Sequence, residues 1–310
     1  MKNIIYSVAC CILGAFALAA IAAEYDMPPA NDDIIGESYI ITVEKGDSLT
    51  TIRKKHGISY DELLAANPTI DFYKLRVGQK VFIPKEFILP KFRRGIVINT
   101  AELRLYYFTP DGKQVYTFPV GLGRSGWRTP LTSATVIRKA EHPAWYVPDD
   151  IRAYVLKKTG RLLPEVVKPG PKNPLGNYAL YLSKSGYLIH GTNAPRSVGT
   201  FISSGCARLL RKPIEFLYQE VTVGTPVHII YYPNKAGWRG NKLYLESHTS
   251  IDSYAKKPDS PLNTISVRTA IYEAIYHRPA YIDWQAVKHI TSEHFGFPQV
   301  IGKKFKLRKE

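Results

Sequence analysis

The alternation of apolar and polar residues between positions 96 and 232 is the feature that most limits how this chain can fold. Residues 96–99 and 103–108 alternate as strands do, and Thr109-Pro110-Asp111-Gly112 is a hairpin turn sequence ahead of a return strand at 114–120. Core packing explains Tyr106, Tyr107 and Phe108 better than a stacking platform does. Further short strands are expected at 134–138, 179–182, 187–189 and 227–232. We therefore predict a mainly β domain over residues 96–232.

His190 and Cys206 are the candidate catalytic residues of this domain. His190 ends a predicted strand, and Cys206 follows a Ser-Ser-Gly turn sixteen residues later, ahead of a helix expected at 209–220. A free thiol has a pKa of about 8.5, so a nucleophilic cysteine needs an imidazole or a helix N-terminus that favours the thiolate. We expect Cys206 to have both, and the amides of Gly205 and Cys206 to point at a developing oxyanion. The alternative is a small buried thiol and a histidine of the core.

The N-terminus bears on the role of Cys206. Residues 4–22 are apolar and follow Lys2, and small residues precede Glu24, which is the layout of a secretory signal peptide over residues 1–23. Its removal would take Cys10 and Cys11 with it and would leave no cysteine to pair with Cys206 within the chain. A membrane span is the competing interpretation, because roughly 19 apolar residues reach the lower limit of spanning length. After cleavage, no stable membrane span is expected.

The net charge of +16 implies a negatively charged partner. The basic residues are scattered along the chain instead of forming one recognition element, so we do not expect nucleic acid as the partner. Peptidoglycan stems and anionic lipid headgroups carry carboxylates or phosphates and suit an exported protein better. A basic surface that serves only solubility is the alternative.

The segment around Cys206 resembles the catalytic signature of the L,D-transpeptidases, the cysteine enzymes that cross-link bacterial peptidoglycan. The resemblance covers about residues 96–232 and implies an L,D-transpeptidase-like β-sandwich. Cys206 would be the nucleophile, His190 the base, and the carbonyl of Gly191 the acceptor that orients the imidazole. The resemblance rests on these segments: Ile-His-Gly-Thr-Asn at 189–193, Ser-Ser-Gly-Cys-Ala-Arg-Leu at 203–209, Phe-Pro-Val-Gly-Leu-Gly-Arg-Ser-Gly-Trp-Arg-Thr-Pro at 118–130, Lys-Pro-Gly-Pro-Lys-Asn-Pro-Leu-Gly at 168–176 and Val-Gly-Thr-Pro-Val at 223–227.

Three further features near the motif are expected to contribute to the site. Ser204 stands where the common motif, Ser-His-Gly-Cys, has a second histidine, and it is expected, with Gly205 and Arg208, to belong to the oxyanion or substrate-binding site. Arg208 is expected to hold the turn, a substrate carboxylate or a structural salt bridge, since a guanidinium suits carboxylate geometry. The basic, proline-rich stretch 152–176 is expected to be a long loop that covers the site.

The resemblance implies a transferase reaction that needs no cofactor. Cys206 would attack the bond between meso-diaminopimelate and D-Ala in a tetrapeptide stem and form a thioester, which an amine of a second stem or of an envelope lipoprotein would resolve. It also implies a periplasmic enzyme of a Gram-negative cell, with a role in cell-wall biogenesis and cell shape and a covalent carbapenem adduct on Cys206.

Three alternatives to this reaction remain open. One is an L,D-carboxypeptidase or hydrolase that resolves the thioester with water. Another is a non-catalytic peptidoglycan-binding protein. The third is a zinc site formed by His190, Cys206 and a residue such as His228, although no metal-ligand spacing is present, and we expect no metal.

Residues 38–84 predict a small α+β module with the order strand, helix, helix, strand. Ser48 is an expected helix cap, and Ser59 with Glu62 forms an expected capping box. The module resembles a LysM domain, which binds the N-acetylglucosamine chains of peptidoglycan or chitin. By that resemblance, glycan would lie between the loop of Gly46, Asp47, Ser48 and Leu49 and the loop 67–71. The expected core is Leu49, Ile52, Leu63 and Leu64.

The remaining segments complete the expected domain order. Residues 24–37 and 85–95 are expected to be linkers. Residues 233–310 form a C-terminal extension with an expected strand at 243–246, helices at 265–277 and 281–294 and a solvated tail at 303–310. This extension resembles that of one Gram-negative subgroup of L,D-transpeptidases, and we expect it to dock or to support a lid.

Overall fold

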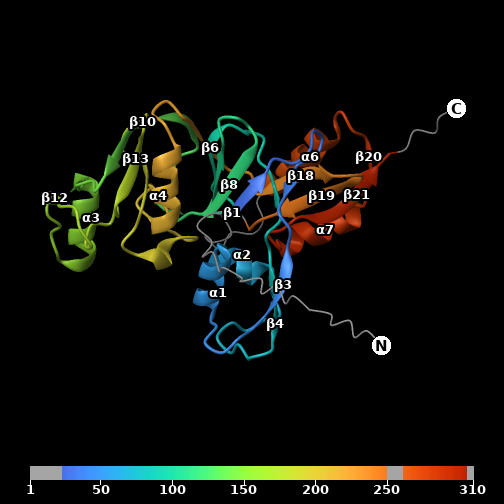
Figure 1. The fold of residues 1–310 in the computed structure, drawn as a ribbon, viewed down its shortest axis with the longest axis horizontal. Helices are drawn as coiled ribbons and strands as arrows, with labels where there is room; N and C mark the ends of the chain where they lie inside the picture. Colours follow the sequence, from blue (N-terminus) through green and yellow to red (C-terminus); the bar gives the residue numbers. More distant parts are fainter. Residues whose placement is uncertain (1–22, 250–260, 306–310) are drawn as a thin grey trace, which may run out of the picture.

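A computed structural model describes residues 23–249 and 261–305. The predicted signal peptide, apart from Ala23, lies outside the described residues, as do residues 306–310 of the predicted tail. Figure 1 shows a curled sheet in the middle and left of the molecule, a second sheet at the right, and the helices α1 and α2 below their junction.

The curled sheet forms the predicted mainly β domain. Nine strands follow the order β1-β8-β7-β6-β17-β10-β13-β14-β16, antiparallel except for the β17–β6 and β14–β16 pairs. Helix α4 (Arg211–Glu220) packs its Ile214 and Leu217 into the core on one face of this sheet. The strands are β1 (Ala23–Asp26), β6 (Gly95–Asn99), β7 (Arg104–Phe108), β8 (Gln114–Pro119), β10 (Thr132–Glu141), β13 (Tyr178–Leu182), β14 (Leu188–His190), β16 (Ala207–Arg208) and β17 (Pro226–Ile230).

Strand β7 shows that both faces of this sheet are covered. Tyr107 points into the core that contains α4, whereas Tyr106 and Phe108 point into a second core on the other face. All three aromatic side chains are at most 2% exposed, which confirms the prediction that they are core residues.

The two predicted linkers differ from expectation. Strand β1 pairs with β8 at the edge of the curled sheet, and β2 (Ile34–Ile35) pairs with β5 (Phe87–Ile88). Ile35, Phe87 and Leu89 are buried in the second core. These segments are therefore packed parts of the fold, because their apolar side chains cover the outer face of the sheet.

The LysM-like module has the predicted element order β3 (Tyr39–Thr42), α1 (Leu49–His56), α2 (Tyr60–Ala65) and β4 (Lys80–Ile83). Ser48 caps α1, and Ser59 and Glu62 form the capping box of α2. Ile52 and Leu63 are buried in the module core, and Leu49 packs against it. Leu64 was wrongly placed in the core, because it is 42% exposed on the outer side of the short helix α2.

The C-terminal extension is a four-stranded antiparallel sheet of order β18-β19-β21-β20 with two helices packed on it. The predicted helix at 281–294 begins later, because Ala280–Ile282 is strand β20 and Asp283 caps α7. Lys303 and Lys304, predicted to be in a solvated tail, belong to β21. The elements are β18 (Asn234–Arg239), β19 (Lys242–Ser247), α6 (Pro261–Ile275), β20 (Ala280–Ile282), α7 (Trp284–Glu293) and β21 (Gln299–Lys304).

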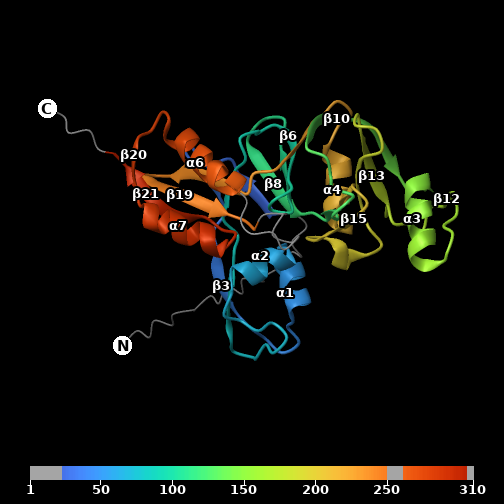
Figure 2. The same cartoon turned by 180° about the vertical axis from the view of Figure 1, so that it is seen from behind.

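The predicted covering loop at 152–176 is partly regular. Helix α3 (Asp149–Thr159) is followed by β12 (Val166–Val167), which pairs with β11 (Trp145–Tyr146). We call this segment, residues 145–176, the flap. Figures 1 and 2 place α3 at the end of the molecule opposite the C-terminal sheet, so the extension does not support the flap. Within the described residues, no helix has the length and apolar character needed to cross a membrane.

Candidate active site

His190 is held in one tautomer at the end of β14. It is buried, and its Nδ1 lies 2.6 Å from the carbonyl oxygen of Gly191. A carbonyl only accepts hydrogen bonds, so Nδ1 carries the proton and Nε2 is left with the lone pair of a base. Burial, together with the positive charge of Arg208, lowers the pKa of His190 to about 4, against the opposing effect of the carbonyls of Gly191 and Leu175. The imidazole is therefore neutral at pH 7.

Cys206 is brought to the same face of the sheet by the parallel pairing of β14 with β16. His190 pairs with Arg208, and Cys206 lies two residues before Arg208, so the alternation of a strand directs all three side chains to one face. Their neighbours Ile189 and Ala207 point to the opposite face and are buried in the core. Adjacent strands lie about 4.8 Å apart, so the two catalytic candidates are diagonal neighbours.

The charge state of Cys206 differs from the thiolate that its surroundings were expected to favour. Cys206 Sγ donates to the carbonyl of Gly186 at 3.6 Å. Burial raises the pKa of Cys206, although the amide of Leu188 and the charge of Arg208 act against this increase. Since the imidazole is also neutral, the resting pair is a thiol beside a base. The expected helix N-terminus is not at Cys206 either, because β16 intervenes and α4 begins at Arg211.

The turn before Cys206 is fixed by hydroxyl groups. Ser203 Oγ donates to the carbonyl of Cys206 at 2.7 Å and accepts from the amide of Gly205 at 3.1 Å. Thr129 Oγ1 donates to the carbonyl of Gly205 at 2.8 Å. Gly205 has a φ of +109°, which favours glycine. The amide of Gly205 was expected to face an oxyanion, but it is used inside the turn.

His190, Cys206 and Arg208 line one cavity of about 590 Å³. The flap forms one wall, to which Ile151 and Val155 of α3 contribute. The cavity is lined by both polar and apolar groups and is large enough for a peptide. Its aromatic lining residues are Trp127, Trp145, Tyr146, Tyr181 and Tyr187.

Comparisons with known proteins establish the family of this chain. Residues 93–229 match the model of the L,D-transpeptidase catalytic domain, and residues 41–84 match the LysM domain. The protein "Probable L,D-transpeptidase YcfS" of Escherichia coli strain K12 is 39% identical over 292 residues, which cover 92% of this chain and 90% of that protein. The chain belongs to the L,D-transpeptidase family.

Two further comparisons are with other proteins named L,D-transpeptidases. "Probable L,D-transpeptidase ErfK/SrfK" of the same E. coli strain is 40% identical over 234 residues, or 72% of this chain and 74% of that protein. Among solved structures, L,D-transpeptidase 3 from Mycobacterium tuberculosis is 15% identical, with a TM-score of 0.33 over 64% of this chain and 92% of that chain.

Ser204, the departure from the common L,D-transpeptidase motif, is bound by an arginine. Arg124 Nη1 donates to Ser204 Oγ at 3.1 Å and lies within 3.4 Å of the carbonyl oxygens of the two preceding residues. Its guanidinium also lies over the rings of Trp127 and of Tyr154 in α3, at 5.2 and 4.5 Å from their centroids. Arg124 thus joins the turn before Cys206 to the flap. Arg124 lies within residues 118–130, but no local pattern there marks it as a site residue.

Arg208 has a free donor beside the L,D-transpeptidase cavity. Its Nε is buried without a hydrogen-bond partner, and burial lowers its pKa. Its backbone exchanges two hydrogen bonds with Gly121, which hold the strand in place. The structure therefore places a guanidinium next to both catalytic candidates.

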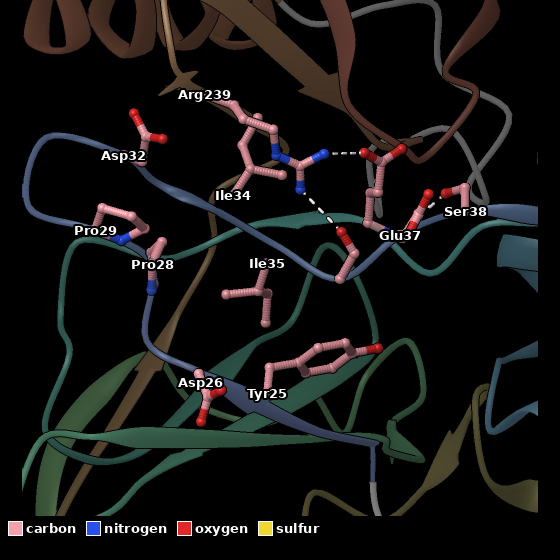
Figure 3. Close-up of a pocket in the computed structure, with 12 residues that line it drawn as sticks. Tyr25, Asp26, Pro28, Pro29, Asp32, Ile34, Ile35, Glu37, Ser38 and Arg239 are labelled. Atoms are coloured by element: carbon pink, nitrogen blue, oxygen red, sulfur yellow. Dashed lines mark hydrogen bonds and ion pairs between the residues drawn. The ribbon is translucent and has the colours of Figure 1, made fainter.

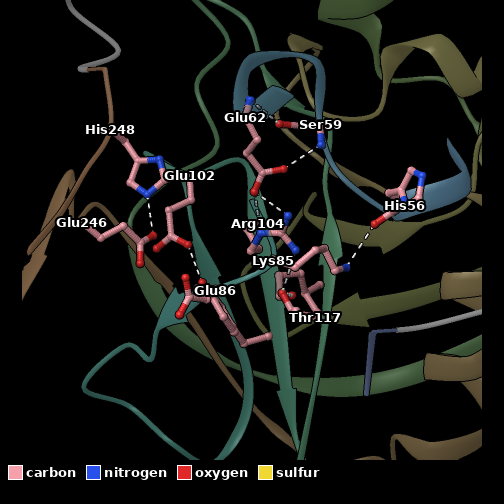
Figure 4. A network of polar contacts seen from close by, with 12 residues as sticks. His56, Ser59, Glu62, Lys85, Glu86, Glu102, Arg104, Thr117, Glu246 and His248 are labelled. Carbon is pink, nitrogen blue, oxygen red and sulfur yellow. Dashed lines mark hydrogen bonds and ion pairs between the residues drawn. The ribbon is translucent and has the colours of Figure 1, made fainter. Parts of the chain in front are cut away.

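The residues of the zinc alternative do not come together in the structure. His228 contacts Ser133 and stacks on Phe92, and it is not among the residues that line the cavity. Among the described residues, Glu102, Glu246 and His248 are close enough to share a cation (Figure 4). The ammonium of Lys235 lies 2.8 and 2.9 Å from the two carboxylates and already supplies that positive charge.

The LysM residues predicted to bind glycan form the turn into α1. The Asp47 carboxylate accepts from the amide of Glu44, and Ser48 caps the helix. Gly46 has a φ of +92°, and nothing lies within 4 Å of a side chain added there, so this part of the loop is open. Leu49 instead packs toward the module core.

A second cavity, of about 670 Å³, shares no lining residue with the cavity of His190 and Cys206. Figure 3 shows it between the N-terminal segment and Arg239 of β18, whose guanidinium pairs with Glu86 and bonds to the carbonyl of Gly36. Neither His190 nor Cys206 lines it.

Proposed function

We propose that this protein is a peptidoglycan L,D-transpeptidase in which Cys206 forms a thioester with a tetrapeptide stem. The observation that carries the proposal is the state of His190. Its Nδ1–H is held by Gly191, its pKa is about 4, and its Nε2 is a base on the same cavity face as the thiol. A neutral imidazole next to a neutral thiol is suited to general-base catalysis.

The acylation step follows from this pair. His190 Nε2 takes the thiol proton as Cys206 Sγ attacks the carbonyl between diaminopimelate and D-Ala. The amide of Cys206 is the donor proposed for the oxyanion, because the Gly205 amide is bound to Ser203. The C–N bond then breaks, His190 returns the proton to the leaving amine of D-Ala, and the thioester remains.

The second step transfers the acyl group to an amine. His190 removes a proton from the attacking amine of a second stem or of a lipoprotein lysine, and the thiol leaves as Cys206 Sγ takes that proton back. Arg208 is proposed to bind a carboxylate of the stem, because its buried Nε has no partner and a guanidinium matches a carboxylate. No cofactor takes part.

The LysM module supports the proposal that the protein acts at the cell wall. We propose that the loop of Gly46, Asp47 and Ser48 contacts the glycan strand, and that the protein works in the periplasm after its N-terminal segment has directed export. Cell-wall biogenesis and sensitivity of Cys206 to carbapenems follow from the same proposal.

The test is to incubate the purified protein with disaccharide tetrapeptides and to analyse the products by mass spectrometry. Release of D-Ala with a cross-linked dimer is expected from the wild type and not from Cys206→Ala. Tripeptide without any dimer or lipoprotein adduct would favour the hydrolase, and unchanged stems together with binding to peptidoglycan would favour a non-catalytic wall protein.

A further inference from the structure

The loop between the two catalytic candidates is supported by the LysM module. Residues 191–200 connect β14 to β15 (Phe201–Ser203) and contain the short helix η1 (Pro195–Ser197). Gly199 has a φ of +80°, and a Cβ added there would lie 2.7 Å from the Cβ of Ser59, the cap of α2. The loop and the helix therefore touch at backbone distance, and a side chain at 199 would separate them.

Arg53 of α1 binds this loop directly. It is 2% exposed, and its guanidinium lies 4.0 Å over the ring of Tyr60. Its Nη1 donates to the carbonyl of Val198 at 3.3 Å and its Nη2 to that of Pro195 at 3.4 Å. The next residue, Lys54, is exposed. The planar fork of an arginine is suited to holding two carbonyls in a fixed relation.

A buried ion pair fixes the module that carries Arg53. Glu62 of α2 pairs with Arg104 of β7, whose guanidinium also bonds to Thr117 and lies over the ring of Phe87 (Figure 4). The same carboxylate accepts from the amide of Ser59 in the capping box. The LysM helices are thus attached to the curled sheet itself, so Arg53 acts from a rigid support.

The loop 191–200 is followed, after the short strand β15, by the turn that carries Cys206. The amide of Leu122 donates to the carbonyl of Thr200, and Gly121 packs against the carbonyl of Ser197 while its own backbone bonds to Arg208. Ser203, at the end of β15, fixes the Cys206 turn. A shift of the loop at Val198 would therefore move the backbone on both sides of the nucleophile.

We propose that Arg53 is a positioning residue for Cys206, so that the LysM module is a structural part of the active site in addition to any role in binding the wall. This rests on the proposed function for its effect on turnover. Misplacing a catalytic group by about 1 Å costs on the order of 100-fold in rate. Arg53→Ala is therefore expected to lower kcat by about 10- to 100-fold, with KM and binding to peptidoglycan little changed.

The experiment compares Arg53→Ala, Arg53→Lys and the matched control Lys54→Ala in the full chain. Steady-state transpeptidation gives kcat and KM, and the rate of iodoacetamide alkylation, read at the peptide that contains Cys206, reports the thiol without substrate. We expect Lys54→Ala to behave as wild type and Arg53→Lys to recover part of kcat, because an ammonium cannot hold both carbonyls as the fork does.

Wild-type kcat and alkylation rate in folded Arg53→Ala would overturn the inference. If that variant does not fold, Arg53→Lys decides: a kcat and alkylation rate equal to wild type would overturn it. If the wild type shows no transpeptidation, the proposed function fails, whereas an altered Cys206 alkylation rate in the Arg53 variants would still support the positioning role.

Discussion

Glu62→Ala tests whether a buried charge pair fixes the LysM module to the catalytic sheet. The Glu62 and Arg104 side chains are 4% and 0% exposed, and Arg104 Nε donates to Glu62 Oε1 at 2.7 Å. Removing one member of a buried pair costs about 3–5 kcal/mol, because the other charge stays desolvated. The lost hydrogen bond to the Ser59 amide adds about 1 kcal/mol. We expect the free energy of opening of α2 to fall by about 4–6 kcal/mol.

Hydrogen exchange of the amides in Tyr60–Ala65, followed by mass spectrometry, measures this free energy for the helix itself. Ser59→Ala removes only the cap and should cost about 1 kcal/mol. The double variant Glu62→Leu with Arg104→Met removes both charges and should recover most of the loss. The reasoning is refuted if Glu62→Ala costs no more than Ser59→Ala.

Two further predictions concern the thiol and the flap. Because burial raises the pKa of Cys206 and that of His190 is about 4, alkylation of Cys206 by iodoacetamide should keep increasing above pH 8, and kcat/KM should fall only below about pH 5. An alkylation plateau from pH 5 to 8 would instead reveal a thiolate–imidazolium pair. Arg124→Ala removes ring contacts to Trp127 and Tyr154 worth about 1 kcal/mol, so KM should rise about fivefold, whereas the exposed flap variant Arg161→Ala should leave KM unchanged. A KM unaffected by Arg124→Ala would show that this arginine does not hold the flap.

Local features of the fold could be predicted because they depend on neighbouring residues. The capping box of Ser59 and Glu62 involves residues three apart, and the turn Thr109-Pro110-Asp111-Gly112 joins the antiparallel strands β7 and β8. The second partner of Glu62, Arg104, lies 42 residues further along the chain, and no local pattern indicates it. The tertiary role of that carboxylate therefore required the structure.

The missed elements have weak sequence patterns for physical reasons. Strands β2 and β5 have two residues each, too few for a period to be recognised. Helix α3 has no buried residue, and Pro148 at its N-cap makes no side-chain cap hydrogen bond, so the usual signal of a helix start is missing. The charge states at the site were missed because burial, which lowers the pKa of His190 and raises that of Cys206, arises only when β14, β16 and the flap come together.

The most direct test of the account is to trap the acyl-enzyme. The purified protein is mixed with a disaccharide tetrapeptide, and the reaction is quenched in acid within seconds. The protein is then digested, and the mass of the peptide that contains Cys206 is measured by mass spectrometry. We expect an added mass equal to the substrate less D-Ala on this peptide, absent in Cys206→Ser and strongly reduced in His190→Ala. Release of D-Ala with no adduct on Cys206, or with an adduct on another residue, would contradict it.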